Sequence, residues 1–143
     1  PTDVTTGGYI GSAMRTSNLN SAKTTIKNAF GSDHILRYYE LLTVLVRDGR
    51  STGWSMFDTD IELMNEPMVY GASVEGSGCN VGSAKSQLAG FAVRGDLAFL
   101  RGYGFWLRDV SSATAFCLVG DRGEATASPA SRSHGVRPSF PIY

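Results

Sequence analysis

Residues 104–128 read GFWLRDVSSATAFCLVGDRGEATAS, and this stretch decides the fold class. Aromatic and aliphatic residues dominate 104–108 and 115–119, and both runs have the length and composition of short β-strands. Glycines enclose a tight turn at 120–123, and 124–128 alternates larger polar with small residues, as the returning arm of a hairpin does. We therefore predict antiparallel β-structure for the last third of the chain.

Two segments earlier in the chain carry helix signals. Residues 19–30 place their apolar side chains at helical spacing, with Asn18 or Asn20 available as the N-terminal cap and Gly31 at the end. Residues 65–71 begin with Asn-Glu-Pro and end with glycine, which is typical of a short capped helix. We predict one helix in each segment.

The segment 36–46 matches two patterns. Its tyrosines, threonine and valines favour a strand, whereas ELLTVLV at 40–46 places apolar residues on one stripe of a helix. We favour a helix for the second half. The cluster DGRSTG at 48–53 predicts a turn, and 54–64 then contains strand-like segments.

Three further segments have weaker signals. Residues 1–17 are rich in glycine, threonine and serine, and we expect an extended arm or a first strand there. Residues 72–86 form a predicted long loop, a feature that is usually functional or mobile in a compact domain. Residues 135–142 predict a final strand, which two prolines confine to a sheet edge or an irregular ladder.

The composition limits the class of protein. A chain of 143 residues, 42% hydrophobic, fits one domain, and because it begins at Pro1 we expect a processed chain or a piece of a longer protein. The 13 basic and 13 acidic residues balance, which argues against a nucleic-acid partner. No apolar run approaches the length of a membrane span, so we expect no membrane insertion.

Few residues have the spacing of a cofactor or metal site. Cys79 and Cys117 are compatible with one disulfide or with two buried thiols. His34 and His134 lie far apart, so we predict neither a metal nor a cofactor. Cys117 with His134 would make a nucleophile and a base, but no local signature supports that pairing, and we favour a buried thiol.

Charged residues allow further alternatives. Asp58, Asp60 and Glu62 alternate along a predicted strand, where they would form a solvated face or, less favourably, a cation site. Asn65 at the head of Asn-Glu-Pro fits a helix start better than a calcium ligand. Arg137 lies among apolar residues, and we expect Asp109 or Glu66 to pair with it, with ligand binding as the alternative role.

An ordered set of motifs carries a family resemblance: ELMNE at 62–66, VYG at 69–71, FWLR at 105–108, AFCLV at 115–119 with its glycine turn, and GVRPSF at 135–140. GYIGS at 8–12 and MRT at 14–16 also fit. The chain resembles C-type-lectin-fold domains of bacteriophage and gut-bacterial proteins. Those domains are similar to the variable proteins of diversity-generating retroelements and, more distantly, to formylglycine-generating enzymes.

The resemblance implies one α+β domain over 1–143, with two helices flanking a small, twisted, mostly antiparallel sheet with long loops. It implies a non-enzymatic recognition domain on a phage particle or other extracellular surface. The partner would be a host-surface protein or glycan, with contacts to other virion proteins or self-association also open. The binding region would be 101–134, with candidate residues Arg101, Tyr103, Asp109, Ser111, Ser112, Thr114, Asp121, Arg122, Glu124, Thr126, Ser128, Ser131, Arg132 and His134.

Two alternatives remain beside recognition. A structural virion component, such as a capsid decoration or tail module, would present an apolar patch from the 1–17 arm or from Phe99, Phe105 and Tyr143. An oxidase of the formylglycine-generating type would need an accessible thiol of low pKa, and the paired-cysteine motif has no counterpart around Cys117. The calcium triplets of true lectins are also absent from the sequence.

Overall fold

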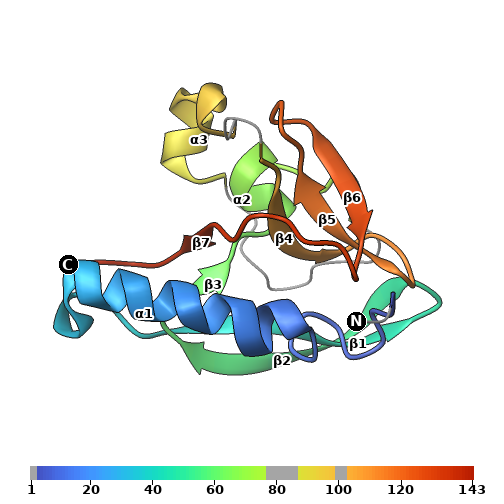
Figure 1. Ribbon diagram of the computed structural model, residues 1–143, viewed down its shortest axis with the longest axis horizontal. Coiled ribbons are helices and arrows are strands. Elements are labelled where there is room, and N and C mark those ends of the chain that lie inside the picture. Colours follow the sequence, from blue (N-terminus) through green and yellow to red (C-terminus); the bar gives the residue numbers. More distant parts are fainter. Residues whose placement is uncertain (1–2, 77–86, 99–102) are drawn as a thin grey trace.

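The computed structural model of the protein describes residues 3–76, 87–98 and 103–143. It is an α+β arrangement of short helices and small antiparallel sheets (Figure 1). The helices are α1 (Leu19–Phe30), α2 (Glu66–Tyr70) and α3 (Ala89–Val93). The strands are β1 (Tyr38–Arg47), β2 (Arg50–Thr59), β3 (Glu62–Leu63), β4 (Phe105–Val110), β5 (Ala115–Val119), β6 (Ala125–Pro129) and β7 (Pro138–Ser139).

The strands form three separate antiparallel sheets within the described residues, rather than the single sheet that we predicted. β1 pairs with β2, β3 pairs with β7, and β4, β5 and β6 form a three-stranded sheet in that order. One core cluster joins α1 to the β1–β2 hairpin and the sheet, through residues such as Leu19, Leu42 and Phe116. A second cluster packs α2 and α3 against β4 and β5.

Helix α1 confirms the predicted range, but its start differs from the prediction. Met14–Asn18 forms a π-helical turn that runs directly into α1, so Asn18 has helical backbone angles and its side chain forms no cap. Asn20 instead donates its amide to the Thr16 carbonyl at 2.8 Å. Gly31 ends the helix as predicted, at a positive φ of 84°.

The first residues do not form the predicted extended arm. The chain makes successive turns there, and Gly8 takes a positive φ of 60° as it passes the Thr43 carbonyl. Tyr9 is fully buried, and its hydroxyl donates to Glu62 at 2.7 Å. Burial of this large ring anchors the segment, which is why it folds onto the core instead of extending.

The second half of 36–46 is a strand, so the predicted helix is wrong. β1 pairs with β2 from Tyr38 opposite Thr59 to Arg47 opposite Arg50, around a turn that contains Asp48. The register shifts after Thr43, which interrupts the alternation of apolar and polar residues that marks a strand. Without a regular alternation, the apolar residues of 40–46 match the apolar stripe of a helix instead.

The predicted solvated acidic face is also wrong for two of its three residues. Asp58 is exposed, but Asp60 and Glu62 are buried. Arg15 binds Glu62 at 2.7 Å, and Lys23 lies 3.4 Å from Asp60. Cationic side chains from the first helical segments compensate the buried carboxylates, a role that the spacing of the acidic residues could not show.

Helix α2 confirms its predicted ends. Asn65 accepts a hydrogen bond from the Met68 amide at 2.9 Å, and Gly71 ends the helix in the left-handed conformation. Glu66 is fully buried and its carboxylate accepts the amides of residues 74–76 at 2.8–2.9 Å, together with the Ser73 hydroxyl. This carboxylate therefore fixes the start of the predicted 72–86 loop, of which 77–86 lie outside the described residues.

The carboxyl-terminal third is β-structure, as predicted. β5 coincides with the predicted 115–119. β4 ends two residues beyond the predicted 104–108, and β6 lies one residue later than the predicted 124–128. The predicted final strand is reduced to β7, with isolated bridges from Gly135 to Phe105 and from Ile142 to Ile35. Helix α3, with Phe91 buried, was not predicted.

Candidate functional site

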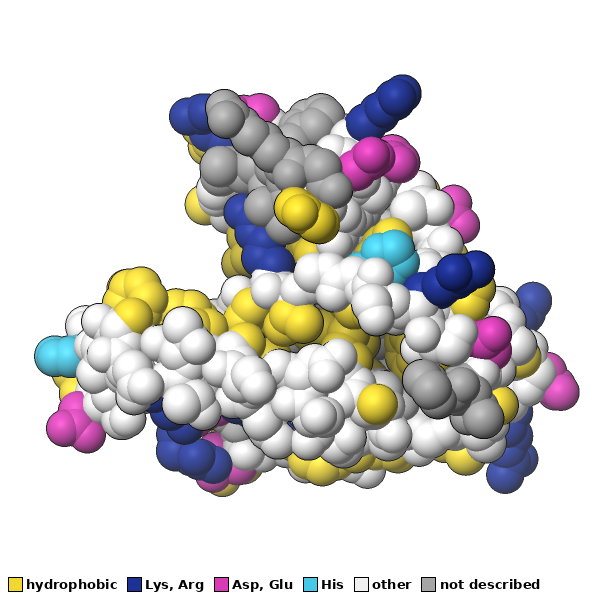
Figure 2. All heavy atoms as spheres, viewed as in Figure 1, with side chains coloured by type: hydrophobic (Ala, Val, Ile, Leu, Met, Phe, Trp, Pro, Cys, Tyr) yellow, Lys and Arg dark blue, Asp and Glu magenta, His cyan; other side chains and the backbone are white. Residues whose placement is uncertain are grey.

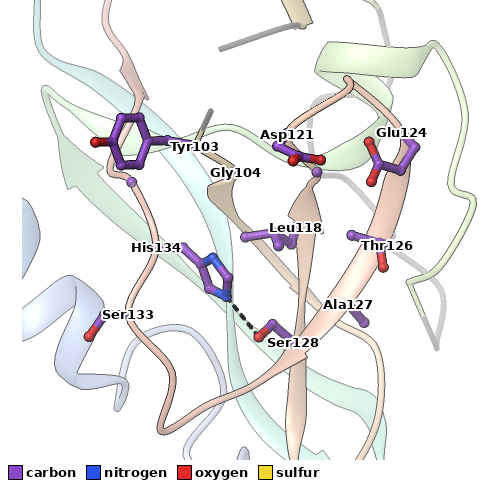
Figure 3. Close-up of a pocket in the computed structure, with 12 residues that line it drawn as sticks. Tyr103, Gly104, Leu118, Asp121, Glu124, Thr126, Ala127, Ser128, Ser133 and His134 are labelled. Carbon is purple, nitrogen blue, oxygen red and sulfur yellow. Dashed lines mark hydrogen bonds between the residues drawn. The ribbon is translucent and has the colours of Figure 1, made fainter. Parts of the chain in front are cut away.

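An open cavity of about 700 Å³ lies on the three-stranded sheet, near the turn between β5 and β6 (Figure 3). Its walls come from the start of β4, the end of β5, the turn, β6 and the returning segment 133–135. The described residues that line it are Tyr103, Gly104, Leu118, Gly120, Asp121, Glu124, Thr126, Ala127, Ser128, Ser133, His134 and Gly135.

The β5–β6 turn is held by several hydrogen bonds. The Gly120 amide donates to the Glu124 carbonyl at 2.8 Å, and the Gly123 amide donates back to the Gly120 carbonyl at 3.0 Å. The Glu124 carboxylate accepts the Arg122 amide at 3.0 Å. Gly123 takes a positive φ of 82°, which glycine adopts without strain. The turn therefore presents its side chains from a fixed backbone.

The opposite wall depends on a close backbone approach between two glycines. The Gly135 amide donates to the Gly104 carbonyl at 2.8 Å, and the Gly135 carbonyl accepts the Trp106 amide at 3.0 Å. A Cβ on Gly104 would lie 2.7 Å from the Val119 carbonyl oxygen, so a side chain there would displace the sheet. These contacts hold 133–135 beside β4.

His134 lies between the floor of the cavity and the core. Its Nε2 is 2.8 Å from the Ser128 hydroxyl (Figure 3), and its ring meets Trp106 edge-on at 4.9 Å. Burial, with a smaller effect of Arg132, lowers the pKa of His134 below its ordinary value of 6.5. The imidazole is therefore neutral at neutral pH.

Two carboxylates and one aromatic ring stand at the rim. Asp121 and Glu124 are exposed on the β5–β6 turn, and Tyr103, 73% exposed, stands on the other side of the cavity (Figure 3). Asp121 takes part in no hydrogen bond or ion pair of the described structure. Among the described residues that line the cavity there is no lysine or arginine.

The predicted site residues divide between several places. Six of them line this cavity: Tyr103, Asp121, Glu124, Thr126, Ser128 and His134. Arg122 is exposed in the same turn but does not line the cavity. Arg101 lies outside the described residues.

The remaining predicted residues lie elsewhere. Ser111, Ser112 and Thr114 form the β4–β5 connection, where the Ser112 carbonyl accepts a hydrogen bond from Thr5 at 2.8 Å. We predicted Asp109 as an exposed ligand-binding residue, but it is buried. Its carboxylate accepts a hydrogen bond from the Glu66 amide, which is a structural role.

A second cavity of about 440 Å³ includes Ser131 and Arg132 in its lining. It lies between the first helical turn and the sheet, with Met14 and Trp106 in its wall. Figure 2 shows hydrophobic side chains between α1 and the β4–β6 part of the molecule. Among the described lining residues, the two cavities have Ser133 alone in common.

Sequence reasoning missed the cavity residues that contribute backbone or small side chains. These are Gly104, Leu118, Gly120, Ala127, Ser133 and Gly135. The available signal was the glycine pattern, because glycine often marks a place where two backbone segments meet. The sequence separation of Gly104 and Gly135 concealed their contact.

Two other residues that the sequence analysis singled out, Cys117 and Arg137, lie outside the cavity lining. Cys117 is a buried free thiol, and burial, with Glu66 as the next cause, raises its pKa. The pairing of Arg137 with Asp109 or Glu66 stays a prediction; its guanidinium lies 5.2 Å from the ring centres of Phe91 and Phe105. Cation–π contact therefore contributes to the stabilisation of this half-buried cation.

No family model, curated protein or solved structure matches this chain. Within the described residues, no cluster of histidine, cysteine and acidic side chains has the arrangement of a metal site. No helix in the same residues is long and apolar enough to span a membrane. The geometry of the cavity is therefore the basis for assigning a function.

Proposed function

We propose that the protein is a non-enzymatic recognition domain that contacts its ligand through the cavity above β5 and β6. The observation that carries this proposal is the set of exposed polar and aromatic side chains around a cavity whose backbone is fixed by hydrogen bonds. Tyrosine with small polar residues is also typical of surfaces that recognise varied partners. A volume of about 700 Å³ is within the usual range for ligand sites.

The resemblance of the sequence motifs supports the finer part of the proposal. We propose a C-type-lectin-like fold, related to the variable proteins of diversity-generating retroelements, displayed on a virion or another extracellular surface. A host-surface protein or glycan would be the ligand. A net charge of zero favours contact through shape and hydrogen bonds over long-range charge steering.

Paired triple variants test the proposal. The tagged chain is applied to glycan and peptide arrays beside a variant with Tyr103→Ala, Asp121→Asn and Arg122→Gln. The control carries Tyr39→Ala, Asp33→Asn and Arg50→Gln, because Tyr39 is 74% exposed and matches Tyr103. We expect the first triple variant to lose the array signal and the control to keep it.

The same assay has results that contradict the proposal. The cavity is not the recognition surface if its triple variant retains the signal, or if only the control variant loses it. Absence of any array signal above background for the wild-type chain would also count against it. Both variants must keep their melting temperature within a few degrees of wild type, because exposed substitutions rarely change stability strongly.

One observation favours a structural virion component as a second candidate. Exposed apolar side chains gather near the end of α1 and the end of the chain, where Phe30 contacts Phe140 and His34 contacts Tyr143. The patch predicted from the sequence shares only Tyr143 with this described one, because Phe105 is fully buried and the first segment is folded, and Phe99 lies outside the described residues. A stable assembly in sedimentation at micromolar concentration would favour this role.

The oxidase alternative depends on Cys117. An attacking thiolate must be exposed and stable at neutral pH. The buried position of Cys117 and its raised pKa support the non-enzymatic proposal instead.

A further inference from the structure

The described lining of the cavity has an unbalanced charge. Its titratable side chains are Asp121, Glu124, Tyr103 and His134. The described lining thus contains two acidic side chains and no lysine or arginine, although Arg122 stands in the same turn and the chain as a whole has a formal charge of zero. A ligand group that contacts these carboxylates directly is bound more strongly if it carries a positive charge.

The two carboxylates differ in how much of their hydrogen-bonding capacity the protein uses. Glu124 accepts the Arg122 amide with one oxygen, whereas Asp121 has no partner in the described structure. An ionised carboxylate has room for several donors, and donors that carry a positive charge bind it most strongly. Asp121 is therefore the group at this site whose binding capacity is least satisfied.

Tyr103 adds a second feature that suits a cation. Its ring is 73% exposed, lines the cavity and stands apart from the two carboxylates (Figure 3). The face of an aromatic ring attracts an ammonium or guanidinium group. A ligand that contacts both Tyr103 and Asp121 would meet an aromatic ring and a carboxylate.

We propose that the ligand group recognised in this cavity is a cation, either a guanidinium or an ammonium, held by Asp121 and Glu124 with Tyr103 against it. This inference rests on the proposed function, because it names the chemistry of the same site. A neutral ligand would satisfy the carboxylates only with ordinary hydrogen bonds, whereas a cation also compensates their charge. The cation could come from a protein side chain or from a free polyamine.

The test uses small probes that separate these sources. Amide NMR shifts of the full chain are followed during titration with the capped tripeptide Gly-Arg-Gly, with the same tripeptide containing citrulline, and with spermidine. Citrulline keeps the shape of arginine but lacks its charge. N-acetylglucosamine serves as a neutral sugar probe.

We expect the arginine tripeptide to shift amides at 120–126 and 133–135, with little effect from the citrulline tripeptide. Asp121→Asn should weaken this binding about tenfold, as expected for loss of a charged hydrogen-bond partner. Asp33→Asn removes the same charge at an exposed position outside the cavity and should leave the affinity unchanged. Added salt should weaken the binding. Spermidine binding at the same amides, without tripeptide binding, would assign the cation to a polyamine.

Several results overturn the inference. Equal binding of the arginine and citrulline tripeptides, unchanged affinity of Asp121→Asn, or no response to either cation would each do so. If the sugar shifts the same amides while the cations do not, the result supports the proposed recognition surface and contradicts its preference for a cation. If the cavity amides respond neither to these probes nor to any ligand found on the arrays, the proposed function falls as well.

Discussion

The Tyr70 hydroxyl donates a hydrogen bond to the Gly123 carbonyl at 3.0 Å, so helix α2 directly supports the turn that carries Asp121 and Glu124. The two partners are 53 residues apart in the sequence. Tyr70 also packs against the second core cluster, which contains Val69 and Phe91. The position of the cavity rim is therefore coupled to the packing of the core.

Tyr70→Phe tests this coupling. Loss of the hydroxyl should reduce the free energy of unfolding by about 1 kcal/mol, because the ring keeps its packing and only one hydrogen bond is lost. Amide hydrogen exchange at 120–124 should become faster. Tyr39→Phe, on an exposed tyrosine of β1, is the control and should change neither quantity. Unchanged exchange at the turn would show that Tyr70 does not support it.

Because Glu62 is buried, we predict that its ion pair with Arg15 contributes more to the free energy of unfolding than an exposed ion pair does. Arg15 binds this fully buried carboxylate through two guanidinium nitrogens, at 2.7 and 3.2 Å. Arg15→Met should reduce the free energy of unfolding by about 3 kcal/mol, because a buried carboxylate loses its main compensating charge. Urea denaturation measures this change.

Arg37→Met is the matched control for that measurement. Arg37 pairs with Asp58 at 3.1 Å, but both side chains are largely exposed. Exposed ion pairs contribute little, so the control should differ from wild type by less than about 0.5 kcal/mol. Equal effects of the two substitutions would mean that Glu62 does not depend on Arg15 in the folded protein.

The sequence predicts the local elements of this fold but not its long-range ion pairs. Helix α1 and helix α2 followed from local signals: apolar spacing in one, and Asn65 with Gly71 in the other. The burial of Glu62 did not follow, because its partners Arg15 and Tyr9 lie about fifty residues away in the sequence. Long-range ion pairs leave no local pattern.

The prediction for the segment that forms strand β1 was wrong for a different reason. Leu42 and Thr43, adjacent in sequence, are both buried, and the pairing register shifts directly after Thr43. Alternation is the main strand signal, and a bulge removes it. The hairpin of the candidate site was predictable because β5 and β6 pair without a shift from Ala115 opposite Pro129 to Val119 opposite Ala125.

The thiol of Cys117 should be inert in the folded protein. Burial raises its pKa, so little thiolate forms and reagents cannot reach it. In a Cys79→Ser background, where Cys117 is the only cysteine, a thiol reagent such as DTNB should react only after urea is added. Reaction of the native protein at the rate of a free thiol would revive the oxidase alternative.

His134 should make stability depend on pH. Its folded-state pKa lies below 6.5, whereas the unfolded chain binds a proton near the ordinary value. The unfolded state therefore gains protons first on acidification, and the stabilising contribution, complete above pH 6.5, is lost as the pH falls through the folded-state pKa. The charged groups near the ring are Arg132 and, across the cavity, Asp121 and Glu124.

Comparison with His134→Asn isolates this contribution. Between pH 7 and pH 5 the wild-type protein should lose more free energy of unfolding than the variant, because only wild type contains the histidine that must be protonated on unfolding. Urea denaturation at each pH measures both slopes. Parallel slopes would contradict a lowered pKa for His134.

The central claim is that a ligand contacts the protein at the cavity above β5 and β6. The most direct measurement is a map of amide NMR shifts in the full chain with the strongest ligand from the arrays bound. We predict that the shifted amides cluster at 103–104, 118–128 and 133–135. Shifts confined to the β1–β2 hairpin, or to the apolar end near Phe30 and Tyr143, would contradict it.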